Sequence, residues 1–174
     1  MNTQPTEETA IATERQVVAL HLGNEVYGID IAIIHTVITP QAITSVPKTP
    51  NFIKGVMNLR GRIVPVIDLR ARFEMQPLEA EKEESARIVI VDTEGITAGL
   101  IVDGVSEVIK LQLDQIEPPS TLISCKGSAF LTGIGRIPTK GGEKEQLILL
   151  MDVAKALTAN AKDLDRLKSL QKAA

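Results

Sequence analysis

Residues 52–73 read FIKGVMNLRGRIVPVIDLRARF, and in this stretch two apolar runs flank the dipeptide Arg60-Gly61. Runs rich in Val and Ile favour β-strands, because branched side chains fit a pleated surface. A glycine between two such runs is typical of a hairpin turn. We therefore predict a β-hairpin with Arg60 near its tip, where the planar guanidinium points outward and suits a carboxylate on a partner.

The composition extends this β prediction to the whole chain. Of the 174 residues, 44% are apolar but only 2% are aromatic, with three Phe, one Tyr and no Trp. Ile, Val and Leu must then fill the core, and a β-branched core favours strands. We expect an all-β protein of one domain, which is usual for a chain of this length.

Charge and cysteine content narrow the classes of partner and compartment. The formal net charge is −3, so no basic excess draws the chain to phosphates, and few aromatic side chains are present to stack on bases. We expect no nucleic-acid partner. The single cysteine, Cys125, cannot form an internal disulfide, and no leader-like or membrane-spanning apolar run is visible. These features predict a cytoplasmic protein without direct membrane insertion.

Three blocks of sequence recur in the same order. Residues 17–38 (VVALHLGNEVYGIDIAIIHTVI) align without a gap to 88–109 (IVIVDTEGITAGLIVDGVSEVI), and Gly28 meets Gly99. FIKGV at 52–56 resembles FLTGI at 130–134, and IVPVIDL at 63–69 resembles LILLMDV at 147–153. Any two strand-forming segments rich in Ile and Val look alike, but three blocks in one order favour an internal duplication.

The duplication predicts two similar β units in one domain. We expect a flexible lead-in at 1–14, a first barrel at about 15–78 and a second barrel at about 86–153, with the acidic linker EAEKEES between them. Each unit is too small for a generous core, so the two should share one hydrophobic interface. Apolar residues at helical spacing predict a C-terminal amphipathic helix within 152–174; they are Val153, Leu157, Leu164 and Leu167.

Motifs of catalysis and metal binding are missing from the sequence. It contains no HExxH, CxxC, GxSxG or GxxxxGK[ST] pattern, so we predict no catalytic residue, no metal site and no cofactor. Asp68 and Asp152 follow matching strands of the two repeats, and we expect each to accept a hydrogen bond from nearby backbone. Arg70 and Arg72 are expected to form a solvated basic rim near Arg60.

Several segments together resemble the CheW family of bacterial chemotaxis coupling proteins. They are YGIDI at 27–31, FIKGV at 52–56, NLRG at 58–61, IVPVIDLR at 63–70, GLIVDGVSEVI at 99–109 and LTGIG at 131–135. The resemblance covers roughly residues 15–158 and implies a single CheW-like domain of two small five-stranded, SH3-like barrels on a shared core. It also implies a non-catalytic scaffold that joins the cytoplasmic tip of methyl-accepting chemoreceptors to the regulatory domain of the histidine kinase CheA.

The same resemblance implies two sets of binding residues. Carried over from the family, the receptor-binding set is Ile34, Gly55, Arg60 and Gly61, and the kinase-binding set is Gly99, Val105 and Val108. Thr36 joins the receptor-binding set, at a position where many relatives carry Glu. The lost negative charge leaves open a paralogous adaptor of a twitching-motility or other chemosensory array. An enzyme with an unrecognised site and a small oligonucleotide-binding barrel remain as rival hypotheses.

Overall fold

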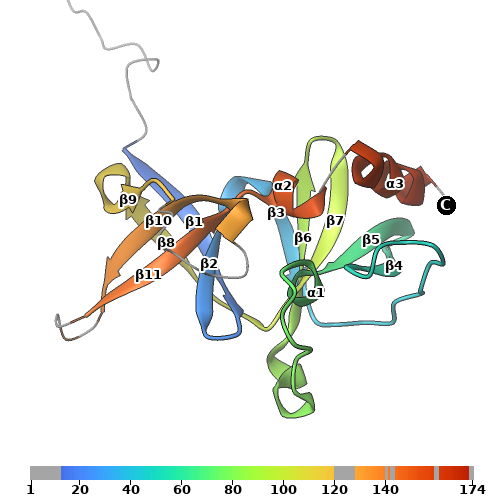
Figure 1. Cartoon of the computed structure of the whole chain (residues 1–174), viewed down its shortest axis with the longest axis horizontal. Coiled ribbons are helices and arrows are strands. Elements are labelled where there is room, and N and C mark those ends of the chain that lie inside the picture. Colours follow the sequence, from blue (N-terminus) through green and yellow to red (C-terminus); the bar gives the residue numbers. More distant parts are fainter. Residues whose placement is uncertain (1–12, 120–127, 140, 142–143, 159–160, 173–174) are drawn as a thin grey trace, which may run out of the picture.

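The computed structural model describes residues 13–119, 128–139, 141, 144–158 and 161–172, and it contains two β-sheets with short helices between and beside them (Figure 1). Sheet A is formed by β1 (Glu14–Leu22), β2 (Glu25–Asp30), β8 (Gly104–Gln112), β9 (Ile116–Glu117), β10 (Leu131–Pro138) and β11 (Glu145–Met151). Sheet B is formed by β3 (Ile34–Ile38), β4 (Ile53–Leu59), β5 (Arg62–Asp68), β6 (Arg87–Thr93) and β7 (Ile96–Val102). The helical elements are η2 (Ile31–Ile33), α1 (Leu69–Arg72), η3 (Ala80–Ser85), η4 (Leu113–Gln115), η5 (Ser128–Phe130), α2 (Val153–Leu157) and α3 (Ala161–Lys172).

The two sheets have the same internal order, as the sequence repeat predicts. Sheet A runs β8-β1-β2-β11-β10-β9, and sheet B runs β3-β6-β7-β5-β4. Each contains a hairpin from the first repeat block, β1–β2 or β6–β7, and a hairpin from the later blocks, β10–β11 or β4–β5. The two hairpins of a sheet meet in parallel, β11 beside β2 and β5 beside β7. The prediction of a mainly β fold with two similar units is confirmed.

The two sheets do not coincide with the sequence segments 15–78 and 86–153. β3 leaves the β1–β2 hairpin and pairs with β6, while β8 leaves the β6–β7 hairpin and pairs with β1. The first crossing is made by η2, whose start is fixed because Asp30 Oδ1 accepts a hydrogen bond from the Ala32 N–H at 2.9 Å. Each sheet therefore contains strands from both halves of the sequence. Pairing between strands that are distant in sequence determines the composition of each sheet. Local sequence patterns do not predict such pairing.

A small apolar cluster lies within each sheet, and a glycine at the same repeat position makes room for it. A Cβ on Gly28 would lie 2.9 Å from Ile148 Cγ2 in sheet A, and a Cβ on Gly99 would lie 2.8 Å from Ile88 Cγ2 in sheet B. Real Cβ atoms do not come so close to other heavy atoms. Gly28 and Gly99 therefore allow the sheets to curl tightly around their own side chains.

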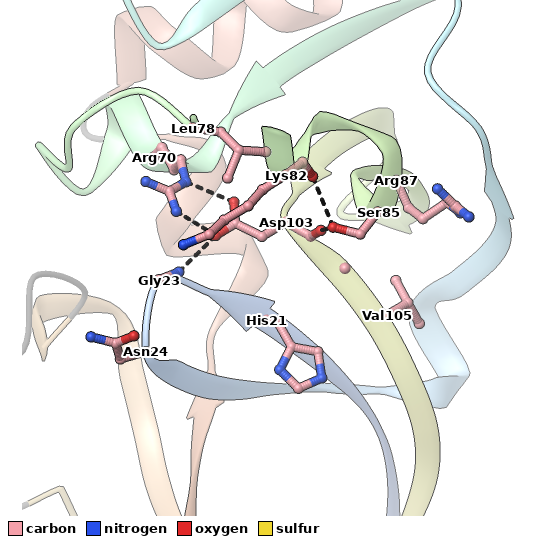
Figure 2. A pocket seen from close by; sticks show the side chains of 11 residues that line it. His21, Gly23, Asn24, Arg70, Leu78, Lys82, Ser85, Arg87, Asp103 and Val105 are labelled. Atoms are coloured by element: carbon pink, nitrogen blue, oxygen red, sulfur yellow. Dashed lines mark hydrogen bonds and ion pairs between the residues drawn. The ribbon is translucent and has the colours of Figure 1, made fainter. Parts of the chain in front are cut away.

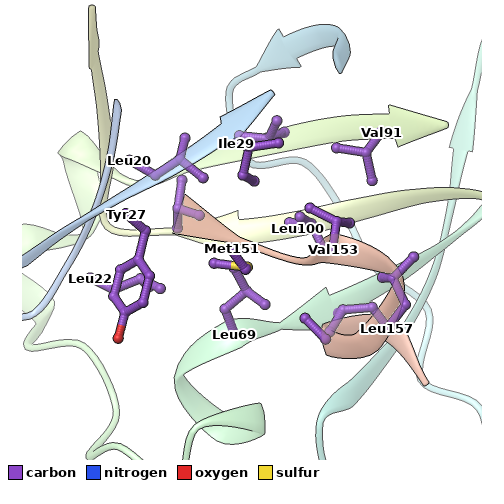
Figure 3. Close-up of a cluster of buried hydrophobic side chains, with 14 of the residues drawn as sticks. Leu20, Leu22, Tyr27, Ile29, Leu69, Val91, Leu100, Met151, Val153 and Leu157 are labelled. Atoms are coloured by element: carbon purple, nitrogen blue, oxygen red, sulfur yellow. The ribbon is translucent and has the colours of Figure 1, made fainter. Parts of the chain in front are cut away.

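A larger core joins the two sheets, and this confirms the predicted shared interface. Leu20 and Ile29 of sheet A and Val91 and Leu100 of sheet B belong to one buried cluster, together with Leu157 of α2 (Figure 3). All five side chains are completely excluded from solvent, at 0% exposure. Burial of apolar side chains of this size stabilises a fold by about 1.5–3 kcal/mol each before entropy losses. The two sheets are therefore one cooperative body.

In each sheet, a short segment that follows an edge strand in the sequence, β3 or β8, pairs with a strand on the far side of the sheet, β4 or β10. In sheet B, the Thr44 N–H donates to the Val56 carbonyl at 2.8 Å and the Val56 N–H donates back at 2.9 Å. In sheet A, β9 pairs with β10. Gly55 permits the first of these contacts: its φ is 153°, and a Cβ there would lie 2.1 Å from the Thr44 carbonyl oxygen.

The C-terminal region forms two helices, where a single helix within 152–174 was predicted. Thr158 ends α2 with extended backbone, at φ −132° and ψ 112°, so α3 starts anew. Val153, Leu157 and Leu167 are buried as the helical spacing requires, while the Leu164 side chain lies outside the described residues. At the other end of the chain, β1 begins at Glu14, and residues 1–12 of the predicted lead-in also lie outside them.

The predicted role of the two repeated aspartates is confirmed. Asp68 Oδ1 accepts hydrogen bonds from the backbone N–H groups of Arg70 and Ala71 at 3.0 and 3.3 Å, and so caps α1. Asp152 Oδ1 accepts one from the Lys155 N–H at 3.2 Å and caps α2. Both carboxylates thus satisfy N–H groups at the start of a short helix.

Substitution of Gly55 by Ala should destabilise the fold strongly. The new Cβ would overlap the Thr44 carbonyl in a backbone conformation that side chains rarely adopt, so we expect the free energy of unfolding to fall by about 2–4 kcal/mol. Gly104→Ala is the matched control, because a Cβ there has its nearest contact at 3.6 Å. Urea denaturation of both variants measures the difference, and equal midpoints would contradict this role of Gly55.

Candidate functional site

The Arg60 turn is a rigid, exposed hairpin tip, as predicted. Arg60 and Gly61 have φ values of 51° and 83°, which is the pair of left-handed conformations that a type I′ hairpin turn requires. Asn58 Oδ1 accepts the Gly61 N–H at 2.8 Å, and Gln41 Nε2 donates to the Asn58 carbonyl at 3.0 Å. The Arg60 side chain is exposed, and within the described residues it forms no ion pair. Its guanidinium is therefore available to a partner.

The other residues of the predicted receptor-binding set do not gather around Arg60. Ile34 and Thr36 lie on β3, and β3 and β4 are at opposite ends of the strand order of sheet B. Both side chains are half-buried, and Ile34 packs against the shared core. Gly55 is buried beneath Thr44, and its requirement for the fold explains the glycine without a binding role. Arg60 and Gly61 are the part of the set that lies at the hairpin tip.

The predicted kinase-binding residues are divided between the two sheets. Val105 and Val108 lie on β8, the edge strand of sheet A, whereas Gly99 is buried within sheet B. Val105 is half-buried opposite Leu20 of the shared core, and Val108 is 50% exposed. Val108 is thus the member of this set whose apolar side chain is exposed to solvent.

Arg70 is not part of a solvated rim, and that prediction is wrong. Its Nε donates to Asp103 Oδ1 at 2.7 Å and its Nη2 donates to Asp103 Oδ2 at 2.5 Å (Figure 2). Asp103 Oδ2 also accepts the Gly23 N–H at 2.7 Å, from the β1–β2 turn of sheet A. Arg70 and Asp103 side chains are only 16% and 14% exposed. This Arg70–Asp103–Gly23 lock ties the two sheets together with charge-assisted bonds.

The pKa values of the lock follow from these contacts. Burial raises the pKa of the Asp103 carboxyl, but hydrogen bonds from Arg70 and from the Gly23 N–H outweigh burial and hold that pKa below its ordinary value. The hydrogen bond to Asp103 raises the pKa of Arg70 against the opposing effect of burial. Both groups are therefore kept charged at neutral pH.

Arg72 is also structural, and it lies between the two repeats. Its guanidinium carbon is 4.6 Å from the ring centroid of Phe52 and 4.7 Å from that of Phe130. Its Nε donates to the Ala156 carbonyl at 2.7 Å, near the end of α2. Burial lowers the pKa of Arg72, although Asp163 raises it. The sequence signal for this site is the repeat itself, which matches Phe52 with Phe130.

All four aromatic residues of the chain belong to one cluster with Arg72, in which Phe52 and Phe130 contact its guanidinium. The Phe73 ring centroid is 5.4 Å from that of Phe130 and 5.6 Å from that of Tyr27, and the Phe52 ring contacts the Arg72 guanidinium. Aromatic pairs and cation–π contacts of this kind each contribute about 0.5–2 kcal/mol. The few aromatic side chains are thus concentrated at the junction of the two sheets.

A pocket of about 570 Å³ lies beside the Arg70–Asp103–Gly23 lock (Figure 2). Its walls include His21 and Asn24 of the β1–β2 hairpin and Lys82 and Arg87 near η3. The two groups here with shifted pKa values, Arg70 and Asp103, are each other's partners and both are held charged. An acid–base catalyst at neutral pH needs the opposite, a pKa moved toward 7. Among the described residues, no three His, Cys, Asp or Glu side chains gather closely enough to hold a metal ion.

The fold and these surfaces have counterparts among known proteins. A family model described as "CheW-like domain" matches residues 16–161. The chain belongs to the CheW family. The match ends at Ala161, the first residue of α3.

Individual CheW proteins are similar over most of the chain. "Chemotaxis protein CheW" of Klebsiella aerogenes is 37% identical over 138 residues, covering 79% of this chain and 78% of that protein. The protein of the same name from Treponema pallidum is 29% identical over 157 residues, covering 89% and 88%. The crystal structure of the scaffolding protein TtCheW from Thermoanaerobacter tengcongensis matches with a TM-score of 0.73 at 38% identity, over 86% of this chain and 96% of that one.

Replacement of Asp103 by Asn should weaken this CheW-family fold in a pH-dependent way. At pH 7 the variant leaves Arg70 without its charged partner, and we expect the free energy of unfolding to fall by about 1–3 kcal/mol. Because the folded state lowers the Asp103 pKa, the contribution of this carboxylate is complete above about pH 5 and declines as the pH falls through the folded pKa. Urea denaturation from pH 7 down to about pH 2.5 should show the wild type and the variant converging.

Glu107→Gln is the control for this measurement. Glu107 is an exposed carboxylate on β8, so its loss should change the free energy of unfolding by less than about 0.5 kcal/mol at every pH. A gap between wild type and Asp103→Asn that stays constant down to the lowest pH would contradict the role given to the ionised carboxylate.

Proposed function

We propose that this chain is a non-catalytic scaffold that couples the cytoplasmic tip of chemoreceptors to the regulatory domain of the histidine kinase CheA in bacterial chemotaxis. The observation that carries the proposal is the Arg60 turn, an exposed guanidinium on a backbone fixed by Asn58, in a chain of the CheW family. Its planar five-donor group suits a carboxylate on the surface of a helical partner. Arg60 and Gly61 form the centre of the proposed receptor surface, with Ile34 and Thr36 at its margin.

A scaffold needs two separate surfaces on one rigid body, and the arrangement of the sheets supports this. The Arg60 turn belongs to sheet B, while the exposed Val108 belongs to β8 of sheet A. The shared core, the Arg70–Asp103–Gly23 lock and Arg72 join the sheets between these two surfaces. We assign Val108, with Val105 beside it, to the kinase side. Modest affinities at each surface suffice, because an array with many linked contacts gains avidity.

The rival functions have less support. The pocket beside Asp103 holds an ion pair whose two charges stabilise each other, which does not suit proton transfer. The net charge of −3 gives no electrostatic attraction to an oligonucleotide. No helix within the described residues is long and apolar enough to cross a bilayer. We place the scaffold in the cytoplasm, recruited to receptor arrays.

Thr36 supports a second version of the same function. Thr36 lies on β3, pairs with Ile90 of β6 and is half-buried, so it offers the surface of sheet B a small hydroxyl in place of a carboxylate. A receptor matched to this surface differs in charge from one that meets Glu. The alternative is therefore a paralogous adaptor in another chemosensory array, such as one for twitching motility. Co-purification from the cell of origin, with the bound receptors identified, decides between the two.

Arg60→Asn should remove receptor binding without disturbing the fold. Asn-Gly is the preferred pair for a type I′ turn, so the variant should be at least as stable as the wild type. Loss of the guanidinium should weaken binding of a soluble helical bundle that carries the receptor tip by about tenfold, with a smaller salt dependence of the association rate. Isothermal titration calorimetry measures the affinity, and stopped-flow at two salt concentrations measures the rate.

Lys48→Asn is the matched control for Arg60→Asn. Lys48 is also an exposed cation in the left-handed conformation, with φ 61°, but it lies outside the proposed surface. Its replacement should leave receptor affinity within about twofold of wild type. If Arg60→Asn binds as tightly as Lys48→Asn, the site assignment is wrong.

Val108→Glu should separate the two partners. A charge at this exposed apolar position should weaken binding to the CheA regulatory domain by about tenfold or more, because the carboxylate would be desolvated without a partner. Binding to the receptor tip should not change. Leu147→Glu, at another exposed apolar position of sheet A, is the control and should bind the kinase domain normally. Equal effects of the two substitutions would argue against a kinase surface on β8.

A further inference from the structure

Helix α3 lies on sheet B, beside the β6–β7 hairpin and above β4 and β5 (Figure 1). It contacts β5 and β7. All but the first residue of α3 lie beyond the family match at 16–161, and the helix covers part of the sheet that carries the Arg60 turn.

Three of the described side chains of α3 lie in one stripe along the helix. Asp163, Leu167 and Gln171 are spaced four residues apart, which puts them on one face. Leu167 is 0% exposed and belongs to the shared core, and Asp163 is 5% exposed. Gln171 Nε2 donates to the Thr97 carbonyl on β7 at 2.8 Å. Among the described side chains of α3, Leu167 is the one apolar group that is fully buried, with Leu170 packed beside it at the edge of the core.

Few of the described side chains that attach α3 to the sheet are apolar. Two of the three stripe positions are polar, and Leu167 is the fully buried leucine among the described side chains. A helix of 12 residues is marginal in water without support from packing. The extended backbone at Thr158 separates α3 from α2, so α3 can leave without unwinding α2. Under the last turn of α3 a pocket of about 230 Å³ remains, which shows that the helix does not fill its groove.

The groove under α3 adjoins the Arg60 turn. The pocket below Gln171 is lined by Gly61, Arg62 and Ile63 from the start of β5 and by Gly95 and Thr97 from the β6–β7 hairpin. Gly61 belongs both to this pocket and to the turn that presents Arg60. A helical partner that binds Arg60 therefore contacts the C-terminal end of α3.

We propose that α3 is a displaceable cover of sheet B, and that one helix of the chemoreceptor tip takes its groove when the receptor binds at the Arg60 turn. The inference rests on the proposed function. The incoming helix has the same chemistry as α3, with a buried leucine between polar side chains at four-residue spacing. Receptor affinity is then reduced by the fraction of molecules in which α3 is docked, so weakening the docking of α3 raises affinity.

Binding to variants of the full chain tests the proposal. Gln171→Ala removes the hydrogen bond to Thr97, and Gln171→Glu replaces the donor with a charge that repels the same carbonyl. Each should raise the affinity for the soluble receptor-tip bundle by about 2- to 10-fold. Lys168→Ala, on the exposed side of the same helix, is the control and should leave the affinity unchanged. Unchanged or lower affinity in both Gln171 variants overturns the proposal.

Hydrogen exchange of the wild-type chain gives an independent readout. Amides of α3 should exchange by local opening, at least about 100-fold faster than those of β7, and adding the receptor-tip bundle should lower their protection further. If α3 exchanges only with global unfolding, or gains protection when the bundle binds, the proposal fails. Arg60→Asn in the same binding assay separates the two proposals. If Arg60→Asn abolishes binding but the Gln171 variants do not raise the affinity, only the proposal that α3 is a displaceable cover is wrong. If Arg60→Asn has no effect on binding, the proposed receptor site is wrong as well.

Discussion

The β1–β2 and β6–β7 hairpins each pair with a strand from the other half of the chain, not with the strand that follows them in sequence. β3 leaves β1–β2 to pair with β6, and β8 leaves β6–β7 to pair with β1. Because of this exchange, each sheet needs both halves of the chain, and the inner faces of the two sheets meet in one core. A unit of this size cannot bury enough apolar surface to be stable alone. The crossing strands therefore join the two small units into one stable domain. The positions of the Arg60 turn and of Val108 relative to each other follow from that crossing.

Polar contacts at the junction join the two sheets in addition to the shared apolar core. Arg72 contacts the matched phenylalanines of the two repeats. Asp103 accepts hydrogen bonds from the Arg70 side chain and from the Gly23 N–H of the opposite sheet. Breaking such a partly buried pair costs more than forming it contributes, because the remaining charge lacks water. The junction therefore favours one relative orientation of the sheets over others. For a chemotaxis scaffold of the CheW family, that orientation fixes the angle at which two partners are held.

Local features of the sequence predicted local structure well. The Arg60-Gly61 turn and the capping aspartates Asp68 and Asp152 depend on neighbouring residues, and pattern and spacing were sufficient for them. The partners of Arg70 and Arg72 are distant in sequence, 33 residues away at Asp103 and 84 away at Ala156, so a charge in a basic run gave no sign of them. The strand exchange was missed for the same reason. Gly99 and Gly55 show a further limit: a glycine near a binding motif fits a surface contact and a tight backbone approach equally well, and only the surrounding atoms distinguish them.

The strand exchange also sets the order in which the molecule is completed during synthesis. All strands of sheet B have emerged once residue 102 leaves the ribosome, whereas sheet A waits for β11, which ends at Met151. Until then β2 has an unpaired edge on the side that β11 later covers, and Tyr27, Leu20 and Ile29 lack part of their surroundings. Open edges and uncovered apolar faces are the features that invite wrong partners in a nascent chain. The first strands made are thus among the last to be fully enclosed.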